Sequence, residues 1–411
     1  MEAKGTTLPL AFLAAVSMWA VGYLGRFPGV GASPRVLGVA FMLLYLAFGY
    51  LAGRVNGRGF WPGAKVGFLT SAVNLLILGS LLAEGGVSPW VFVPGALLSG
   101  GVLAGLGSFL ARGKQLSVDG AELFARTAVA ATFLLVVAGG LVTSQGAGLA
   151  VPDWPNTYGS NMFFFPLSRM TGGVYYEHAH RLFGSLVGLT VLTLAAYLSW
   201  LRKPRGIVRW AWVLVLMVVV QGVLGGLRVT GKLTLSQDPA ALEPSLGLAV
   251  VHGVLGQLVL AGLVALAVGL AAIRRGSDEG SLLWPRWLWG LLLLQLVMGA
   301  LQRHFAQGLL VHISLATVVL LLAALGAARL LGRSTLRPWA RALLVVVGLQ
   351  VVLGFAALWV RGYPPGARAQ TPLEVLLTTA HQAGGALLLS LATALAVRTW
   401  PRALGLFGVR R

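Results

Sequence analysis

The sequence predicts an all-α polytopic membrane protein, and three observations support this prediction. Hydrophobic residues make up 57% of the chain, charged residues 10%, and the mean hydropathy is +0.84, whereas a soluble globular chain carries about 25% charged residues. The apolar residues form runs near the roughly 20 residues that cross a bilayer. The net charge of +20 comes from Lys and Arg in short loops between these runs. We therefore expect a lipid bilayer around the chain and no nucleic acid partner.

Twelve apolar runs are long enough to be predicted as membrane-spanning helices. They lie at about 8–25, 36–53, 64–84, 89–111, 123–145, 179–201, 208–229, 247–273, 283–302, 308–332, 339–360 and 375–399. If each run crosses the membrane once, the basic loops all lie on one side, which the positive-inside rule assigns to the cytoplasm. The sequence thus predicts a multi-pass protein of the cell membrane with both termini in the cytoplasm.

Four of the six histidines occupy related positions in the last eight runs. His180 is followed by His312 after 132 residues, and His252 is followed by His381 after 129 residues. Each stands within the first two turns of a predicted span that enters from the outer side. A small residue follows each histidine four positions later, and we expect it to leave room for a flat ring; these residues are Gly184, Ala316, Gly256 and Gly385.

The repeat divides the chain into three predicted parts. Gln221–Gly225 recurs as Gln350–Gly354 at the same offset of 129 residues. Such similarity is typical of parallel structural repeats in membrane proteins. We predict a first four-helix half at 113–275 and a second at 276–411. Residues 1–112, which contain no histidine, form an appended four-span region of unknown role.

Paired histidines on facing helices favour one kind of site over its alternatives. Two such imidazoles can ligate a haem iron axially, and helix bundles hold such cofactors in their cores. Zinc or copper usually takes three or four converging protein ligands. A single histidine near a helix end is often only bonded to a carbonyl group or water, and intramembrane His and Glu can also form a proton relay. The doubled pairs favour haem ligation.

An acidic residue distinguishes the two halves. Glu177 lies three residues before His180 and so on the same face of a helix, whereas Leu309 holds the matching position before His312. A partly desolvated carboxyl group can act as a general acid or base; the alternative is an acid favoured by the helix dipole. We therefore expect chemistry at the first pair and electron transfer at the second.

The remaining polar residues near span ends have two interpretations each. Arg181, Arg228 and Arg361 could pair with haem propionates or anchor their spans at the interface. His178 cannot share the face of His180 and is expected at the solvent side or in a loop. His304 is expected at the interface, with a contact to a haem edge as the alternative.

Several stretches resemble the haem A synthase family, and the resemblance covers about residues 123–400. The most specific stretch is GLVTSQGAGLAVPDWP at 140–155, followed by EHAHR at 177–181. The segment GLRVTG at 226–231 and the helix bearing His252 add to it. The family is similar in having eight spans in two four-helix halves, with a histidine pair in each.

The resemblance implies an oxidoreductase that converts the C8 methyl group of haem O to a formyl group through hydroxylated intermediates, giving haem A. It implies that His180 and His252 hold the substrate or product haem and that His312 and His381 hold haem b as axial ligands. Glu177 then acts near the reacting haem. The implied partners are the farnesyl transferase that supplies haem O and an electron acceptor.

Two departures from the family and two other functions remain. Many bacterial members carry a cysteine pair in the first outer loop, and this chain has no cysteine. The four leading spans are also outside the usual pattern. The histidine pairs are also compatible with a di-haem b electron-transfer protein without catalysis. Twelve spans with an internal repeat are common in polytopic transporters.

Overall fold

The structure is a computed structural model, described here for residues 5–84, 86–232, 243–275, 280–362 and 370–407. Its long helices are α1 (Thr7–Gly25), α2 (Pro34–Asn56), α3 (Phe60–Ile77), α5 (Pro89–Phe109), α6 (Gly120–Ser144), α7 (Gly172–Trp200), α8 (Arg205–Thr230), α9 (Leu246–Arg275), α10 (Trp284–Phe305), α11 (Leu309–Leu330), α12 (Arg337–Arg361) and α13 (Pro372–Arg398). The short elements are α4 (Ser80–Glu84), α14 (Pro401–Leu406), two 3-10 turns (Met162–Phe164 and Leu167–Arg169) and the two-stranded antiparallel pair β1 (Asn156–Thr157) and β2 (Ser160–Asn161).

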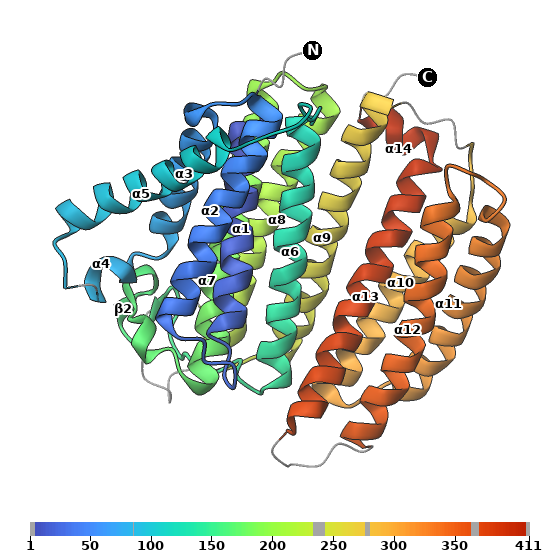
Figure 1. Ribbon diagram of the computed structural model, residues 1–411. Coiled ribbons are helices and arrows are strands. Elements are labelled where there is room, and N and C mark those ends of the chain that lie inside the picture. Colours follow the sequence, from blue (N-terminus) through green and yellow to red (C-terminus); the bar gives the residue numbers. More distant parts are fainter. Residues whose placement is uncertain (1–4, 85, 233–242, 276–279, 363–369, 408–411) are drawn as a thin grey trace. The chain divides into compact units, whose positions relative to one another are not determined.

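The predicted all-α polytopic membrane architecture is confirmed (Figure 1). Within the described ranges, ten helices are long and apolar enough to cross a membrane; α3 and α10 are not among them. The run predicted at 64–84 is broken into two helices, because α3 ends at Ile77 and α4 starts at Ser80. Gly79 and Ser80 lie at the break, and both residue types have weaker helix propensity than the leucines around them.

The chain forms two compact units. The first comprises Met1–Ala131 and Pro155–Leu194, and the second comprises Thr132–Trp154 and Ala195–Arg411. Helices α6 and α7 are each continuous across a unit boundary. The division predicted from the sequence repeat, at 112/113 and 275/276, stays a prediction.

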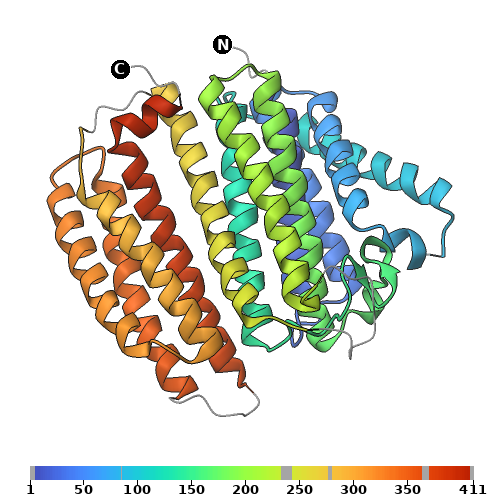
Figure 2. The same cartoon turned by 180° about the vertical axis from the view of Figure 1, so that it is seen from behind.

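Glycines bring α2, α3 and α5 of the first unit into close contact. A Cβ atom added at Gly49 of α2 or at Gly63 of α3 would overlap the main-chain oxygen of Ala104 in α5, and one at Gly67 would overlap that of Gly100. Gly49 and Gly53, and likewise Gly63 and Gly67, have the spacing at which small residues let membrane helices pack backbone to backbone. In both views α5 is strongly inclined to α2 (Figures 1 and 2).

Aromatic side chains join α1 to α7, so the leading region is not separate from the motif-bearing helix. Trp19 stacks on Phe183 with ring centres 6.0 Å apart, and Tyr23 stacks on Tyr175 at 5.5 Å. The Tyr175 hydroxyl also donates a hydrogen bond to the main-chain oxygen of Tyr23. Such ring pairs contribute about 0.5–1.5 kcal/mol beyond the area that they bury. Residues 7–25 therefore support α7 beside the EHAHR stretch.

The second unit is built around a helix bundle of α10, α11, α12 and α13 (Figures 1 and 2). Its core is aliphatic and includes fully buried Leu288, Ala323, Leu343 and Leu395. The neighbouring helices α8 and α9 pack as an antiparallel pair, fixed in part by a hydrogen bond from the Trp210 indole to the main-chain oxygen of Gly262 (3.0 Å).

Two histidine-bearing helices begin earlier than the apolar runs indicated. Helix α7 begins at Gly172 rather than at 179, and α13 begins at Pro372 rather than at 375. The early start of α13 follows from its cap, because the Thr371 side chain accepts a hydrogen bond from the main-chain nitrogen of Glu374 (3.2 Å). His180 and His381 therefore lie in the third turn of their helices, and the expected position within the first two turns holds only for the other two histidines.

Candidate functional site

His312 of α11 and His381 of α13 face each other in the second unit. Their ring centres are 6.3 Å apart and the ring planes make an angle of 80°. A bond from an imidazole nitrogen to a metal ion is about 2 Å long and the nitrogen lies about 1 Å from the ring centre, so two imidazoles on opposite sides of one ion have centres about 6 Å apart. The separation of the two ring centres is therefore close to that of two imidazoles bound to one ion.

A glycine on the preceding helix lies against each of three histidine rings. A Cβ atom added at Gly225, Gly299 or Gly354 would meet the Cε1 atom of His252, His312 or His381 at 3.0, 3.1 and 3.0 Å respectively. These distances are shorter than ordinary contacts. Only glycine lets each imidazole keep its present position, and the three rings share one orientation relative to their helix neighbours.

Two of the small residues that follow the histidines face glutamines. An added Cβ atom at Gly256 or Gly385 would lie 3.0 or 3.3 Å from the Nε2 atom of Gln221 or Gln350. The room for a flat ring stays a prediction. At Gly184 the space beside the Cα atom is open.

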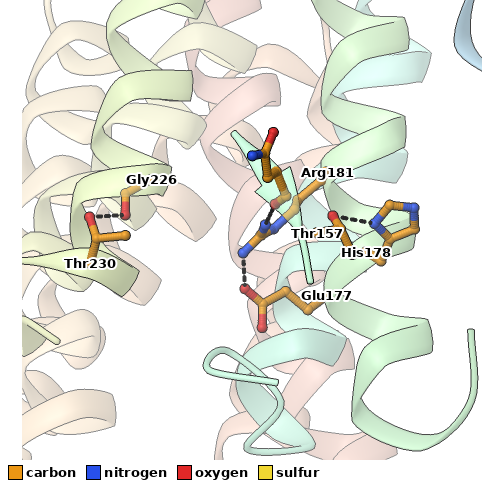
Figure 3. A network of polar contacts seen from close by, with 7 residues as sticks. Thr157, Glu177, His178, Arg181, Gly226 and Thr230 are labelled. Carbon is orange, nitrogen blue, oxygen red and sulfur yellow. Dashed lines mark hydrogen bonds and ion pairs between the residues drawn. The ribbon is translucent and has the colours of Figure 1, made fainter. Parts of the chain in front are cut away.

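The EHAHR stretch forms a buried polar network in the first unit (Figure 3). Arg181 and Glu177, one helical turn apart, form an ion pair at 2.8 Å, with side chains 9% and 5% exposed. The Arg181 guanidinium also donates to the main-chain oxygen of Asn156 in β1 (3.0 Å). The carboxylate is thus held in one orientation, away from bulk water.

His178 is buried, which contradicts the expectation of a solvent-side position. Its Nδ1 atom is 3.1 Å from the Thr157 hydroxyl, and its ring lies 4.9 Å from the ring of Phe165. It points to the opposite side of α7 from Glu177 (Figure 3). The loop between α6 and α7 folds back over this side of the helix, which the sequence did not indicate. His178 therefore fixes the loop to α7.

Basic side chains gather at the ends of α8, α10 and α12 in the second unit. Arg228, Arg303 and Arg361 all lie close enough to His304 to interact electrostatically with it. Arg303 also donates to the Ser144 hydroxyl (3.1 Å). Arg303 was not singled out by the sequence, although its place four residues after Gly299 puts it on the ring-facing side of α10. This cluster can pair with anionic groups.

The two motifs at 140–155 and 226–231 meet in the second unit. The Trp154 indole lies on Gly226, where an added Cβ atom would overlap the ring. Gly148 lies equally close to the Arg228 guanidinium. The loop after α6 therefore covers the last turn of α8.

Some of the predicted site residues are neighbours in the structure, and others belong to different units. His312 and His381 are neighbours, and so are Glu177 and Arg181. His180 belongs to the first unit and His252 to the second, so their pairing still rests on the repeat. Sequence reasoning missed Gln295 and Gly299, whose spacing repeats that of Gln221–Gly225 and Gln350–Gly354.

The fold and these side chains define the class of this protein: a multi-pass helical membrane protein with two histidine rings close together in its second unit. Residues 122–314 match the family model of the cytochrome oxidase assembly protein. The match supports the resemblance to the haem A synthase family; it includes Glu177, His180, His252 and His312 and ends before His381. A comparison with curated proteins finds no match.

Proposed function

We propose that this protein is a haem A synthase, which oxidises the C8 methyl group of haem O to a formyl group. The match of residues 122–314 to the family model of the cytochrome oxidase assembly protein supports a haem-modifying enzyme. The observation that carries the haem part of the proposal is the 6.3 Å separation of the His312 and His381 rings.

The residues at this pair fit a haem better than another metal. The macrocycle supplies the equatorial ligands of haem iron, so the protein needs to add only two axial imidazoles. A zinc site needs three or four protein ligands, and within the described ranges no three His, Cys, Asp or Glu side chains converge. His312 and His381 would hold haem b.

His180 and His252 would hold the reacting haem, as the repeat and the family resemblance imply. A bound haem supplies the iron and the methyl group that is oxidised. When water supplies the formyl oxygen, conversion of methyl to formyl releases four protons and four electrons. The electrons pass to the acceptor, and Glu177, three residues before His180, is a carboxylate that can accept one of the protons. Arg181 holds the Glu177 carboxylate through Oε1, and burial of both side chains keeps bulk water away from it.

The same proposal implies a membrane, a source of haem O and an electron acceptor. The helices place the protein in a membrane; we assign the cell membrane, with the histidine pairs near the outer face and the termini in the cytoplasm. Haem O comes from a farnesyl transferase, and the oxidation needs an electron acceptor. Arg181 and Arg228 would pair with haem propionates when haem is bound.

Pigment analysis tests the function directly. The protein is co-expressed with a source of haem O, purified in detergent, and its haems are extracted and separated. We expect haem B together with haem A or a hydroxylated form of haem O. Haem B alone would indicate a di-haem electron-transfer protein, and a protein without a Soret band would indicate a transporter.

A further inference from the structure

A glutamine recurs beside three of the four repeated histidines. Helices α8, α10 and α12 each carry a glutamine four residues before the glycine that faces the ring; the three pairs are Gln221–Gly225, Gln295–Gly299 and Gln350–Gly354. A spacing of four residues places both members on one face of a helix. We call each pair a histidine cradle.

The glutamine of a cradle contacts the histidine helix through both its main chain and its side chain. Gln221 Nε2 donates to the main-chain oxygen of His252 (2.8 Å), and Gln295 Nε2 donates to that of His312 (3.0 Å). Nδ1 of His252 lies 3.2 Å from the main-chain oxygen of Gln221. The Nδ1 atoms of His312 and His381 are buried, and neither has a hydrogen-bond partner among the described residues.

The contact of His252 Nδ1 with the Gln221 carbonyl group selects one ring nitrogen for a metal. An imidazole whose Nδ1–H donates to a carbonyl group presents Nε2 as the lone-pair donor, and such partners orient metal-bound histidines in proteins. At His312 the Nε2 atom is 3.3 Å from Gln295 Nε2. A metal at this nitrogen would replace that contact and leave the bond to the main-chain oxygen in place.

Helix packing alone does not account for the glutamines. The side-chain Oε1 atoms of Gln221, Gln295 and Gln350 are buried without a hydrogen-bond partner. A buried acceptor without a partner destabilises a fold, and an aliphatic residue of the same size would avoid this cost. The occurrence of glutamine at three related places indicates a role in holding the histidines.

We propose that Gln221, Gln295 and Gln350 are positioning residues, which with their glycines fix the ring plane and the metal-binding nitrogen of His252, His312 and His381. This inference rests on the proposed function, because it assigns the haem b ligands His312 and His381 a shared support. Helix α6, which precedes His180, contains no glutamine, so the cradle is a property of three histidine helices.

The test uses the full-length protein purified with haem b. Gln350→Met keeps the side-chain volume but removes the amide that lies against Gly385, four residues after His381. We expect haem b at the wild-type stoichiometry, a changed low-spin EPR spectrum, a shifted midpoint potential and a several-fold faster loss of haem to apomyoglobin. The matched control is Gln382→Met on α13, whose amide donates to the main-chain oxygen of Val136 on α6 instead (3.3 Å); its spectrum and potential should equal those of the wild type.

A second variant keeps the test decisive if Gln350→Met does not fold. Gly354→Ala adds a methyl group against His381 Cε1, whereas Gly348→Ala, on the same helix, adds one in open space. We expect an altered EPR spectrum only for Gly354→Ala. Wild-type spectra and potentials in the folded cradle variants would overturn the cradle while leaving the proposed function standing. A wild-type protein without haem b would overturn both.

Discussion

The surroundings of His312 and His381 differ in kind from those of the EHAHR stretch on α7. The two rings of the second unit lie against glycines and glutamines, and Leu309 holds the place that Glu177 holds on α7. Helix α7 instead carries an ion-paired carboxylate and a buried imidazole bonded to a loop hydroxyl. The first arrangement suits a group held in a fixed position. The second provides a buried carboxylate, which the proposed reaction uses as a proton acceptor.

The largest expected effect comes from removing single histidine ligands, because the loss of haem b and the loss of haem A formation should occur in different variants. His312→Ala or His381→Ala should remove haem b from the purified protein, because each deletes one of two axial ligands. His252→Ala should abolish haem A formation and leave haem b bound. Extracted haem per protein measures both outcomes. Equal loss of both haems from every variant would mean that the two pairs are not independent sites.

A smaller effect tests whether proton transfer is confined to α7. Glu177→Gln should keep both haems but lower turnover about 10²–10⁴-fold, the usual contribution of a positioned acid or base. The matched control is Glu122→Gln on α6, since Glu122 is also buried and also pairs with an arginine four residues later, Arg126. Conversion of haem O is followed by chromatography.

Turnover of the control should stay near the wild-type rate. If Glu177→Gln also turned over at that rate, Glu177 would have no part in the reaction. Proton transfer would then not distinguish α7 from the region of His312 and His381.

The smallest expected effect tests the contact of α1 with α7, which lies within the first unit. Trp19→Ala removes the ring stacked on Phe183 and should lower the free energy of unfolding by about 2–3 kcal/mol. Thermal unfolding in detergent measures it, with Trp90→Ala as the control, because Trp90 of α5 is 89% exposed. Haem b content should not change in either variant; its loss from Trp19→Ala would show that α1 also supports the second unit's site.

The sequence predicted the helices well because each apolar run reports a local property. Each of the twelve runs contains a long helix, but α3 and α10 are not among the ten candidate membrane spans of the described ranges. The run at 64–84 is also interrupted at Gly79 and Ser80. The early starts of α7 and α13 were missed because their first turns contain glycine, proline or glutamate, which interrupt the apolar runs.

The candidate site was predicted in part for a similar reason. Repeat spacing identified His312 and His381, which the structure places together. Gln295 could have been found from the spacing of the other two cradles. The burial of His178 depends on how the loop with Thr157 and Phe165 folds over α7, and no local pattern reports such a distant contact. The contact of α1 with α7 was not predicted for the same reason.

The close approach of Trp154 and Gly226 links two positions that are 72 residues apart in the chain. No side chain larger than hydrogen fits at 226 while the indole stays in place, and a smaller residue at 154 would leave the end of α8 uncovered. Substitutions at these two positions should consequently be accepted only in pairs. Related chains that have lost the tryptophan are expected to carry a larger residue opposite it, so the two sites would vary together during divergence.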